Sequence, residues 1–387
     1  MMNKSLHGLV NIEINSDNEN INSYMDLEFS HLTDGNDGEK IKIDFVNEIV
    51  VKENVYALGK GIFYDNINEV IYISKNSQTS FFNEEEIYIK MTSPLKDQGP
   101  INIEVCLGKK INSSLIGRIK SRVWQIIKKE PRSNLRKIAE IIVSQFIEVN
   151  IYKMIARQEK LLLHAAALEN EGNGTLIFGP QNVGKTTITL GLAKQQWTML
   201  GDDFCIVDKK GQLMSYSKPL KIEKELIESD SEILNKSMKG ILIDPALKSF
   251  INKIPFYNVK SEYKVHPDNL GIKTGDNASI NNLIFLQRKS FDENSDDIIV
   301  DKLSTEDAYD LMLKHNRVEF DGNKKVDREL RQYLSLFIRD YQSQSILLED
   351  DYKFLKDIIS DANLYLITMN NPNKSALNTI MELCKSN

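Results

Sequence analysis

A phosphate-binding loop motif constrains this chain more than any other feature of its sequence. The segment Gly179-Pro-Gln-Asn-Val-Gly-Lys-Thr186 satisfies the pattern G-x-x-x-x-G-K-[ST] in full. The apolar segment Thr175–Phe178 precedes the motif, and good helix formers follow it over Lys185–Gln196. Strand, loop and helix in this order are the context in which such a loop binds phosphates. The sequence therefore predicts a polyphosphate site within an α/β core.

The residue types of the loop follow from this task. Gly179 and Gly184 permit a tight turn and a close approach of the backbone to the phosphates. The free N–H groups and the positive dipole end of the following helix attract the same anion. Lys185 can place its ammonium between the β- and γ-phosphates, and Thr186 can place its hydroxyl on Mg²⁺. The alternative, a glycine-rich turn without a ligand, leaves the Lys-Thr pair unexplained.

A pair of adjacent carboxylates follows only one helix later, in Leu200-Gly-Asp-Asp-Phe204. Near a phosphate site, two carboxylates can do two different jobs. One can hold Mg²⁺, and the other can accept the proton of an attacking hydroxyl. The alternative is a simple Asp-rich turn. At this distance from the loop we favour the functional interpretation of Asp202 and Asp203.

A histidine stands within the apolar segment Leu161–Leu168, which we expect to be one strand. This strand is expected to form a β-hairpin with Thr175–Phe178, whose end leads into the phosphate loop. A lone His in an apolar strand is most often a buried structural residue. From this position, however, His164 could reach the γ-phosphate or the carboxylate base.

The sequence pattern along the whole chain predicts an α/β fold that is divided into three regions. Residues 1–110 are expected to form a β-rich domain, 111–160 a helical connector and 161–387 the domain that carries the loop. Strands are expected at Ile41–Val51, Glu69–Ser74, Glu86–Met91 and Ile101–Leu107, and connector helices at Leu115–Lys129 and Leu135–Gln158. Later we expect a strand at Asn281–Leu286, a helix capped by Ser304–Asp307 and running through Leu313, a helix at Asp327–Tyr341, a strand at Asn363–Thr368 and a last helix to about Cys384.

Composition excludes several classes of function. The formal net charge of −6 gives no basic surface for phosphate backbones, so nucleic acid is not an expected partner. No segment is apolar enough for a signal peptide or a bilayer span, so no membrane partner is expected. The cysteines Cys106, Cys205 and Cys384 form neither a CxxC pair nor a zinc pattern. We expect a cytoplasmic protein, and the sequence leaves the formation of a homo-oligomer open.

These elements together resemble the catalytic domain of HPr kinase/phosphorylase. They are still more similar to the diverged HPr-kinase-like proteins encoded beside biosynthetic clusters for ribosomal peptides such as lasso peptides. The resemblance rests on His164-Ala-Ala-Ala, the loop Gly179–Thr186 and Gly201-Asp202-Asp203, with weaker echoes in Tyr263–Pro267 and Leu283–Arg288. It covers Leu161 to Leu313 and implies a P-loop kinase core akin to that of phosphoenolpyruvate carboxykinase, after a β-rich N-terminal domain.

The resemblance implies a role for each matched residue. Asp202 would be the catalytic base, and the reverse assignment of Asp202 and Asp203 stays open. His164 would either support the base or touch the transferred phosphate. Thr186 and Asp203 would hold Mg²⁺, while Lys264 and Arg288 would meet transition-state charge or the substrate. ATP would be bound by the loop residues Gly179, Gln181, Asn182, Val183, Gly184, Lys185, Thr186 and Thr187.

Two departures from the family limit what the resemblance implies. Thr187 stands where HPr kinase carries Glu, and the family's Gly-rich downstream signature is missing from the sequence. Phosphorylase activity, and HPr as the substrate, are therefore not implied.

The expected function is transfer of the ATP γ-phosphate, with Mg²⁺, to a hydroxyl. The expected acceptor is a Ser of a small protein or of a ribosomal precursor peptide. Two alternatives stay open: a kinase of a small metabolite, and a nucleotide-binding regulatory protein without transfer activity.

Overall fold

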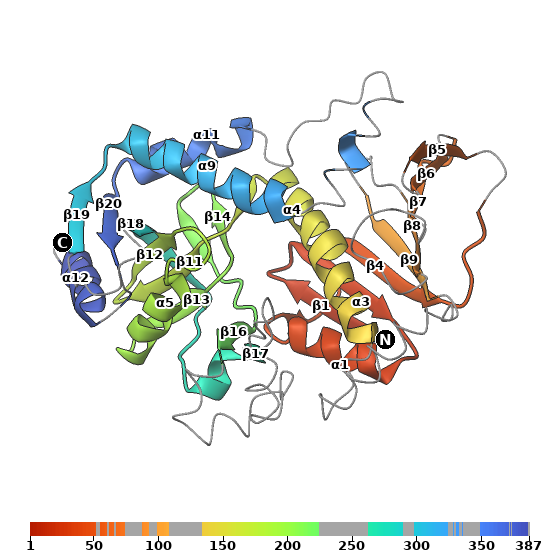
Figure 1. The fold of residues 1–387 in the computed structure, drawn as a ribbon, viewed down its shortest axis with the longest axis horizontal. Coiled ribbons are helices and arrows are strands. Elements are labelled where there is room, and N and C mark those ends of the chain that lie inside the picture. The colour runs from red at the N-terminus through yellow and green to blue at the C-terminus, as the bar shows by residue number, and fades with distance from the viewer. Residues whose placement is uncertain are drawn as a thin grey trace, which may run out of the picture. The chain divides into compact units, whose positions relative to one another are not determined.

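The protein is described by a computed structural model, in which the chain forms two compact units (Figure 1). Unit 1 comprises Met1–Met154, Lys221–Val265 and Lys324–Ser343, and unit 2 comprises Ile155–Leu220, His266–Asn323 and Gln344–Asn387. The residues that the structure describes are 1–51, 55–59, 62–65, 67–73, 87–92, 99–107, 134–223, 262–288, 298–323, 328, 330–332, 335, 349–370, 372 and 374–385.

Unit 1 is built on a large sheet with the strand order β3-β1-β2-β4-β9-β8-β7-β6-β5. The β2–β4 and β4–β9 pairs are parallel, whereas the other neighbours are antiparallel. The strands are β1 (Met2–Leu6), β2 (Val10–Asn15), β3 (Thr33–Asp34), β4 (Glu39–Val46), β5 (Tyr56–Gly59), β6 (Ile62–Asp65), β7 (Val70–Ile73), β8 (Ile87–Thr92) and β9 (Ile101–Leu107). A separate two-stranded sheet joins β16 (Leu220–Glu223) to β17 (Glu262–Val265).

The β-rich character predicted for the N-terminal region is confirmed. Three predicted strands correspond to β7, β8 and β9, whereas the predicted strand Ile41–Val51 is too long because β4 ends at Val46. The apolar residues beyond that end are not in the core, since Val50 is 71% exposed. Two-residue periodicity does not separate such a surface segment from a buried strand.

In unit 1, one predicted helix is present and one observed helix was not predicted. The helix predicted from Leu135 to Gln158 is present as α3 (Asn134–Ile142), a π-helical turn (Val143–Ile147) and α4 (Glu148–Arg157) in succession. It packs against α1 (Glu19–Glu28), which was not predicted because its apolar signal is short. The predicted helix Leu115–Lys129 lies outside the described residues.

Unit 2 is built on a mixed sheet with the order β10-β14-β15-β18-β12-β11-β13, in which β20 also pairs with β18 and β19 with β20. The β12–β18 and β18–β20 pairs are parallel. The strands are β10 (Lys160–Leu163), β11 (Ala166–Asn170), β12 (Asn173–Phe178), β13 (Thr198–Gly201), β14 (Cys205–Asp208), β15 (Gln212–Met214), β18 (Asn277–Arg288), β19 (Ile298–Lys302) and β20 (Asn363–Met369).

The single strand predicted at Leu161–Leu168 is wrong. The chain breaks at His164 and Ala165, because the two halves pair with different neighbours. β10 pairs with β14, whereas β11 pairs with β12 and β13. The predicted hairpin is present as β11–β12. The break removes His164 from the regular ladder.

Helices cover both faces of the unit 2 sheet (Figure 1). On one face α5 (Lys185–Lys194) and α12 (Lys374–Lys385) share an apolar core with strand residues that include Ile284 and Leu286. On the other face lie α9 (Thr305–Asn323) and α11 (Glu349–Ile359), which pack against each other. The alternation of side chains along β18 turns Phe285 to this second face, where its ring stacks on Phe178.

Several predicted elements of unit 2 are confirmed with changed ends. β18 extends beyond the predicted Asn281–Leu286, and β20 and α12 occupy the predicted positions. Ser304 caps α9 as predicted, since the Asp307 N–H donates to its hydroxyl at 3.1 Å, but α9 continues past Leu313 to Asn323. The predicted helix at 327–341 falls mostly outside the described residues. A short 3₁₀ helix spans Pro267–Leu270.

The sheet brings the predicted site segments to one edge. β12, β18 and β20 are parallel, so their carboxyl ends lie together, and ligands of α/β sheets bind at such an edge. The start of β11 pairs with the end of β12, and the end of β13 pairs with the start of β11. His164, the loop after Phe178 and the turn after Gly201 therefore meet there. None of the described helices has the length and apolar character that a bilayer crossing requires.

A buried polar ladder across the parallel strands gives a test of this sheet. Asn282, 1% exposed, donates to Thr175 Oγ1 at 3.2 Å and accepts from Asn363 Nδ2 at 3.0 Å. We expect Asn282→Ala to lower the free energy of unfolding by about 1–3 kcal/mol, because two partners lose a hydrogen bond. Chemical denaturation measures this change, with Ser279→Ala on the exposed side of the same strand as control. Equal losses in both variants would contradict the ladder's contribution.

Candidate functional site

The loop between β12 and α5 contains two residues with left-handed backbone conformation. Asn182 and Gly184 have φ angles of 64° and 102°, and Val183 is buried beneath the loop. A Cβ atom at Gly184 would lie 2.5 Å from the Pro372 ring, so both the conformation and the space require glycine. No described side chain caps the N-terminus of α5, which leaves its first amide groups for a ligand.

The first two residues of α5, Lys185 and Thr186, direct their side chains to different partners. Lys185 is 9% exposed, and its Nζ lies 3.4 Å from Nδ1 of His164. The Thr186 hydroxyl donates to Oδ2 of Asp202 at 2.8 Å. The sequence grouped Thr186 with Asp203 as metal ligands, whereas the structure places its hydroxyl against Asp202.

The two aspartates occupy different environments. Asp202 is buried, and its Oδ1 has no hydrogen-bond partner among the described residues. Burial, and then the charge of Asp203, raise the pKa of Asp202 to about 6. Asp203 is half-buried. A buried carboxylate with one unsatisfied oxygen is costly in the free protein and fits a site that receives a cation.

A sharp turn aims this pair. A Cβ atom at Gly201 would lie 2.1 Å from the Phe204 carbonyl oxygen, so only glycine allows the chain to close so tightly before Asp202. The Phe204 ring meets the His164 ring edge to face, with the centroids 5.3 Å apart. Steric exclusion of a Cβ atom therefore explains why glycine precedes the two aspartates of the Gly-Asp-Asp motif.

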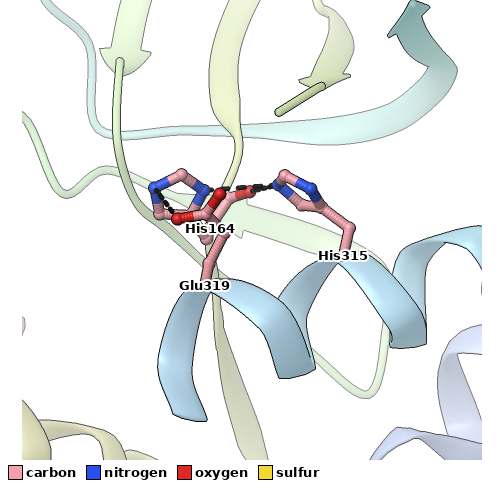
Figure 2. Close-up of side chains that lie close together, drawn as sticks. All are labelled: His164, His315 and Glu319. Carbon is pink, nitrogen blue, oxygen red and sulfur yellow. Dashed lines mark hydrogen bonds and ion pairs between the residues drawn. The ribbon is translucent and has the colours of Figure 1, made fainter. Parts of the chain in front are cut away.

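Side chains from α9 approach His164 (Figure 2). Its backbone N–H donates to Asn316 Oδ1 at 2.8 Å, and its carbonyl oxygen lies 3.0 Å from Nε2 of His315. Its Nε2 lies 3.8 Å from a carboxylate oxygen of Glu319, which is 6% exposed. Figure 2 shows His315 and Glu319 one turn apart on the helix, both directed toward His164.

Both histidines are neutral near pH 7. Burial, together with the positive charge of Lys185, lowers the pKa of His164 to about 3. The same two causes lower the pKa of His315 to about 4. The cluster therefore holds two uncharged imidazoles beside one ammonium.

The remaining predicted residues fall into two groups. In the loop, Gln181 is exposed and Thr187 half-buried. Arg288 ends β18 at the same sheet edge, where its Nε donates to the Asn370 carbonyl at 3.1 Å. Lys264 belongs to unit 1, where it forms an ion pair with Glu28 at 2.5 Å.

Sequence reasoning missed the residues His315, Asn316 and Glu319. The predicted helix stopped at Leu313, before any of them. His315 and Glu319 are four residues apart, a spacing that places both on one helical face. This spacing is the signal that a longer predicted helix would have offered.

Comparisons with known proteins give partial matches. The family model described as SynChlorMet cassette protein ScmC matches residues 130–239, which is less than half of the 387-residue chain. No curated protein matches the sequence significantly. Among solved structures, the chain is similar to the Hpr(Ser) kinase/phosphatase from Coxiella burnetii, with 13% identity and a TM-score of 0.25 over 58% of this chain and 93% of that one.

The low pKa of His315 predicts a dependence of stability on pH. Because the folded value of about 4 lies below the ordinary 6.5, the folded state binds fewer protons than the unfolded state between these values. The free energy of unfolding should therefore fall as pH falls through this window. His315→Gln retains an amide donor but cannot titrate, so its decline should be shallower. Urea denaturation from pH 7 to pH 4 measures both slopes, and equal slopes would contradict the burial of a neutral His315.

Proposed function

We propose that unit 2 binds Mg·ATP and transfers its γ-phosphate to a hydroxyl group. The observation that carries the proposal is the contact between Thr186 and Asp202 at the start of α5, beside an unsatisfied buried carboxylate oxygen. A hydroxyl and a carboxylate at the mouth of a phosphate-binding loop are the oxygen ligands that Mg²⁺ takes in such sites.

The donor set fits a divalent cation. Oδ1 of Asp202 lacks a partner, and a cation beside it would offset the cost of burying the ionised carboxylate. Bound Mg²⁺ would neutralise charge on the β- and γ-phosphate oxygens. We therefore assign Thr186 and Asp202 to the metal, which is the reverse of the preferred sequence assignment and the alternative that the sequence left open.

Asp203 is then the proposed base. A base must reach the proton of the acceptor hydroxyl, so it needs an approach from solvent. Asp203 is half-buried, whereas Asp202 is buried. This difference in access favours Asp203 for proton transfer.

The loop supplies the rest of the nucleotide site. Amide groups from Gly179 to Thr187 would surround the phosphates, and Lys185 would place its charge on the β- and γ-oxygens. Arg288 lies at the same edge of the sheet and is a candidate for transition-state charge or for contact with the acceptor. Catalysis would then consist mainly of positioning and charge stabilisation.

The proposed acceptor is a Ser of a small protein or precursor peptide. Its support is the similarity of the His164, loop and Asp-Asp pattern to HPr-kinase-like proteins. The β-rich unit 1 is the proposed region for acceptor recognition. A screen of Ser- and Thr-containing peptides against small hydroxylated metabolites separates this acceptor class from the metabolite alternative.

The first test concerns nucleotide binding. Lys185→Ala should weaken Mg·ATP binding by about tenfold or more, because the charge on the phosphates is lost. Isothermal titration measures the affinity, and circular dichroism checks that the variant folds. Lys194→Ala removes an exposed lysine from the other end of α5 and should bind as the wild type does. An unchanged affinity in Lys185→Ala would refute the phosphate-loop assignment.

The second test separates the aspartates. Asp202→Asn should raise the Mg²⁺ concentration needed for half-maximal activity, because a charged ligand is lost. Asp203→Asn should leave Mg·ATP binding nearly intact and slow transfer by about two orders of magnitude, the scale of a lost acid–base group. Rates are measured with a peptide found in the acceptor screen.

The opposite pattern in these two variants would return the base to Asp202. Wild-type transfer rates in both would identify the pair as a polar turn. A wild type that binds ATP but phosphorylates nothing would favour the regulatory alternative.

A further inference from the structure

We propose that His164 is a positioning residue for Lys185, and that side chains of α9 hold it in one tautomer for that purpose. The inference deepens the proposed function and rests on it, since it concerns the lysine of the proposed nucleotide site. It assigns His164 no direct contact with phosphate and no proton transfer. It also gives His315, Asn316 and Glu319 a role in the site.

Side chains of α9 hydrogen-bond with the backbone of His164. This residue lies at the break between β10 and β11, so neither strand ladder satisfies its N–H and carbonyl groups. Asn316 Oδ1 accepts from the N–H, while its own amide group donates to the Met312 carbonyl at 3.0 Å and so fixes which end points to His164. His315 meets the carbonyl oxygen. Two consecutive residues of α9 therefore replace the missing strand partners.

The contacts then determine where the ring protons lie. A carbonyl oxygen only accepts, so Nε2 of His315, 3.0 Å from the His164 carbonyl, must carry a proton. An ammonium only donates, so Nδ1 of His164, 3.4 Å from Lys185 Nζ, must present its lone pair. The protonated Nε2 of His315 lies 3.3 Å from the same Nδ1, which also requires a lone pair there. The neutral His164 ring consequently carries its proton on Nε2. That N–H lies toward the buried carboxylate of Glu319, which favours this tautomer electrostatically.

The result is a chain of contacts from Glu319 through His164 to Lys185. A neutral nitrogen holds an ammonium less strongly than a carboxylate does, because it lacks the Coulomb attraction of a full negative charge. His164 can thus keep Lys185 ordered in the free protein without competing with incoming phosphate. An uncharged acceptor suits a lysine that must change partner when ATP binds.

His164, His315 and Glu319 also have possible ligand atoms within 4.8 Å of one another, a spacing that a metal ion could bridge. Two observations favour the positioning role. His315 Nε2 is engaged with a carbonyl oxygen, so its lone pair is not directed at a shared metal. The positive Lys185 lies 3.4 Å from His164 and would repel a cation there.

The tautomer is tested by nitrogen NMR of the full-length protein labelled with ¹⁵N-histidine. The two ring nitrogens of each histidine are distinguished by their shifts, and His164→Asn and His315→Gln assign the signals. We expect a proton on Nε2 of both rings in the wild type. Glu319→Gln should add a second tautomer of His164, whereas Glu306→Gln, an exposed residue of α9, should change nothing. A His164 ring protonated on Nδ1 in the wild type overturns the inference.

The role of His164 is tested by a double-mutant cycle on Mg·ATP affinity. His164→Ala should weaken binding by about three- to tenfold, and His164→Asn, whose amide oxygen lies near the position of Nδ1, should restore it to within about twofold of wild type. In a Lys185→Ala background, His164→Ala should have no further effect, because the histidine acts through the lysine. A full additional loss in that background means direct contact with the nucleotide and overturns the inference.

Two further outcomes separate failure of the proposed function from a metal site at His164. A wild type that binds no Mg·ATP refutes the proposed function, and the Lys185 role falls with it, while the NMR experiment still reports on the α9 contacts. A titration with Zn²⁺ alone should leave the ring nitrogens of His164 and His315 unmoved. Stoichiometric shifts of both would identify a metal site and overturn the positioning role.

Discussion

The parallel pairing of β12 with β18 is the constraint on which the site depends. It places the end of β12, and with it the loop that begins at Gly179, on the same sheet edge as Arg288. The antiparallel partners β11 and β13 then return His164 and the Asp202 turn to that edge. Buried amide side chains such as Asn282 hold the far ends of the parallel strands in register. A shift of one residue in this register would turn the phosphate loop's neighbours to the opposite face.

The edge combines opposite charges that are only partly neutralised. Lys185 meets a neutral imidazole, whereas Asp202 meets a hydroxyl and has one unsatisfied oxygen. Each arrangement costs free energy in the ligand-free protein, because buried charges prefer full partners. A polyphosphate with its cation would complement both at once, since it brings anionic oxygens to the lysine and positive charge to the carboxylate. Under the proposed function, these incompletely neutralised charges would favour ligand binding at the expense of stability.

Helix α9 shows how a second layer can define a site. Its residues His315, Asn316 and Glu319 lie far from the phosphate loop in sequence but surround His164 at the break between two strands. The break costs two ladder hydrogen bonds, and the helix supplies replacements. A regular strand at this point would have satisfied His164 without α9 and left its ring orientation to packing alone.

The sequence by itself determined the local elements whose signals are short in range. The motif from Gly179 to Thr186, the hairpin before it and the capped start of α9 each follow from residue type and spacing within a few positions. Only the tertiary structure decided which aspartate meets Thr186, because Asp202 and Asp203 are adjacent and a turn sets their directions. It alone also revealed the strand break at His164. Pairing with β14 on one side and with β12 on the other is a non-local choice that apolar periodicity does not encode.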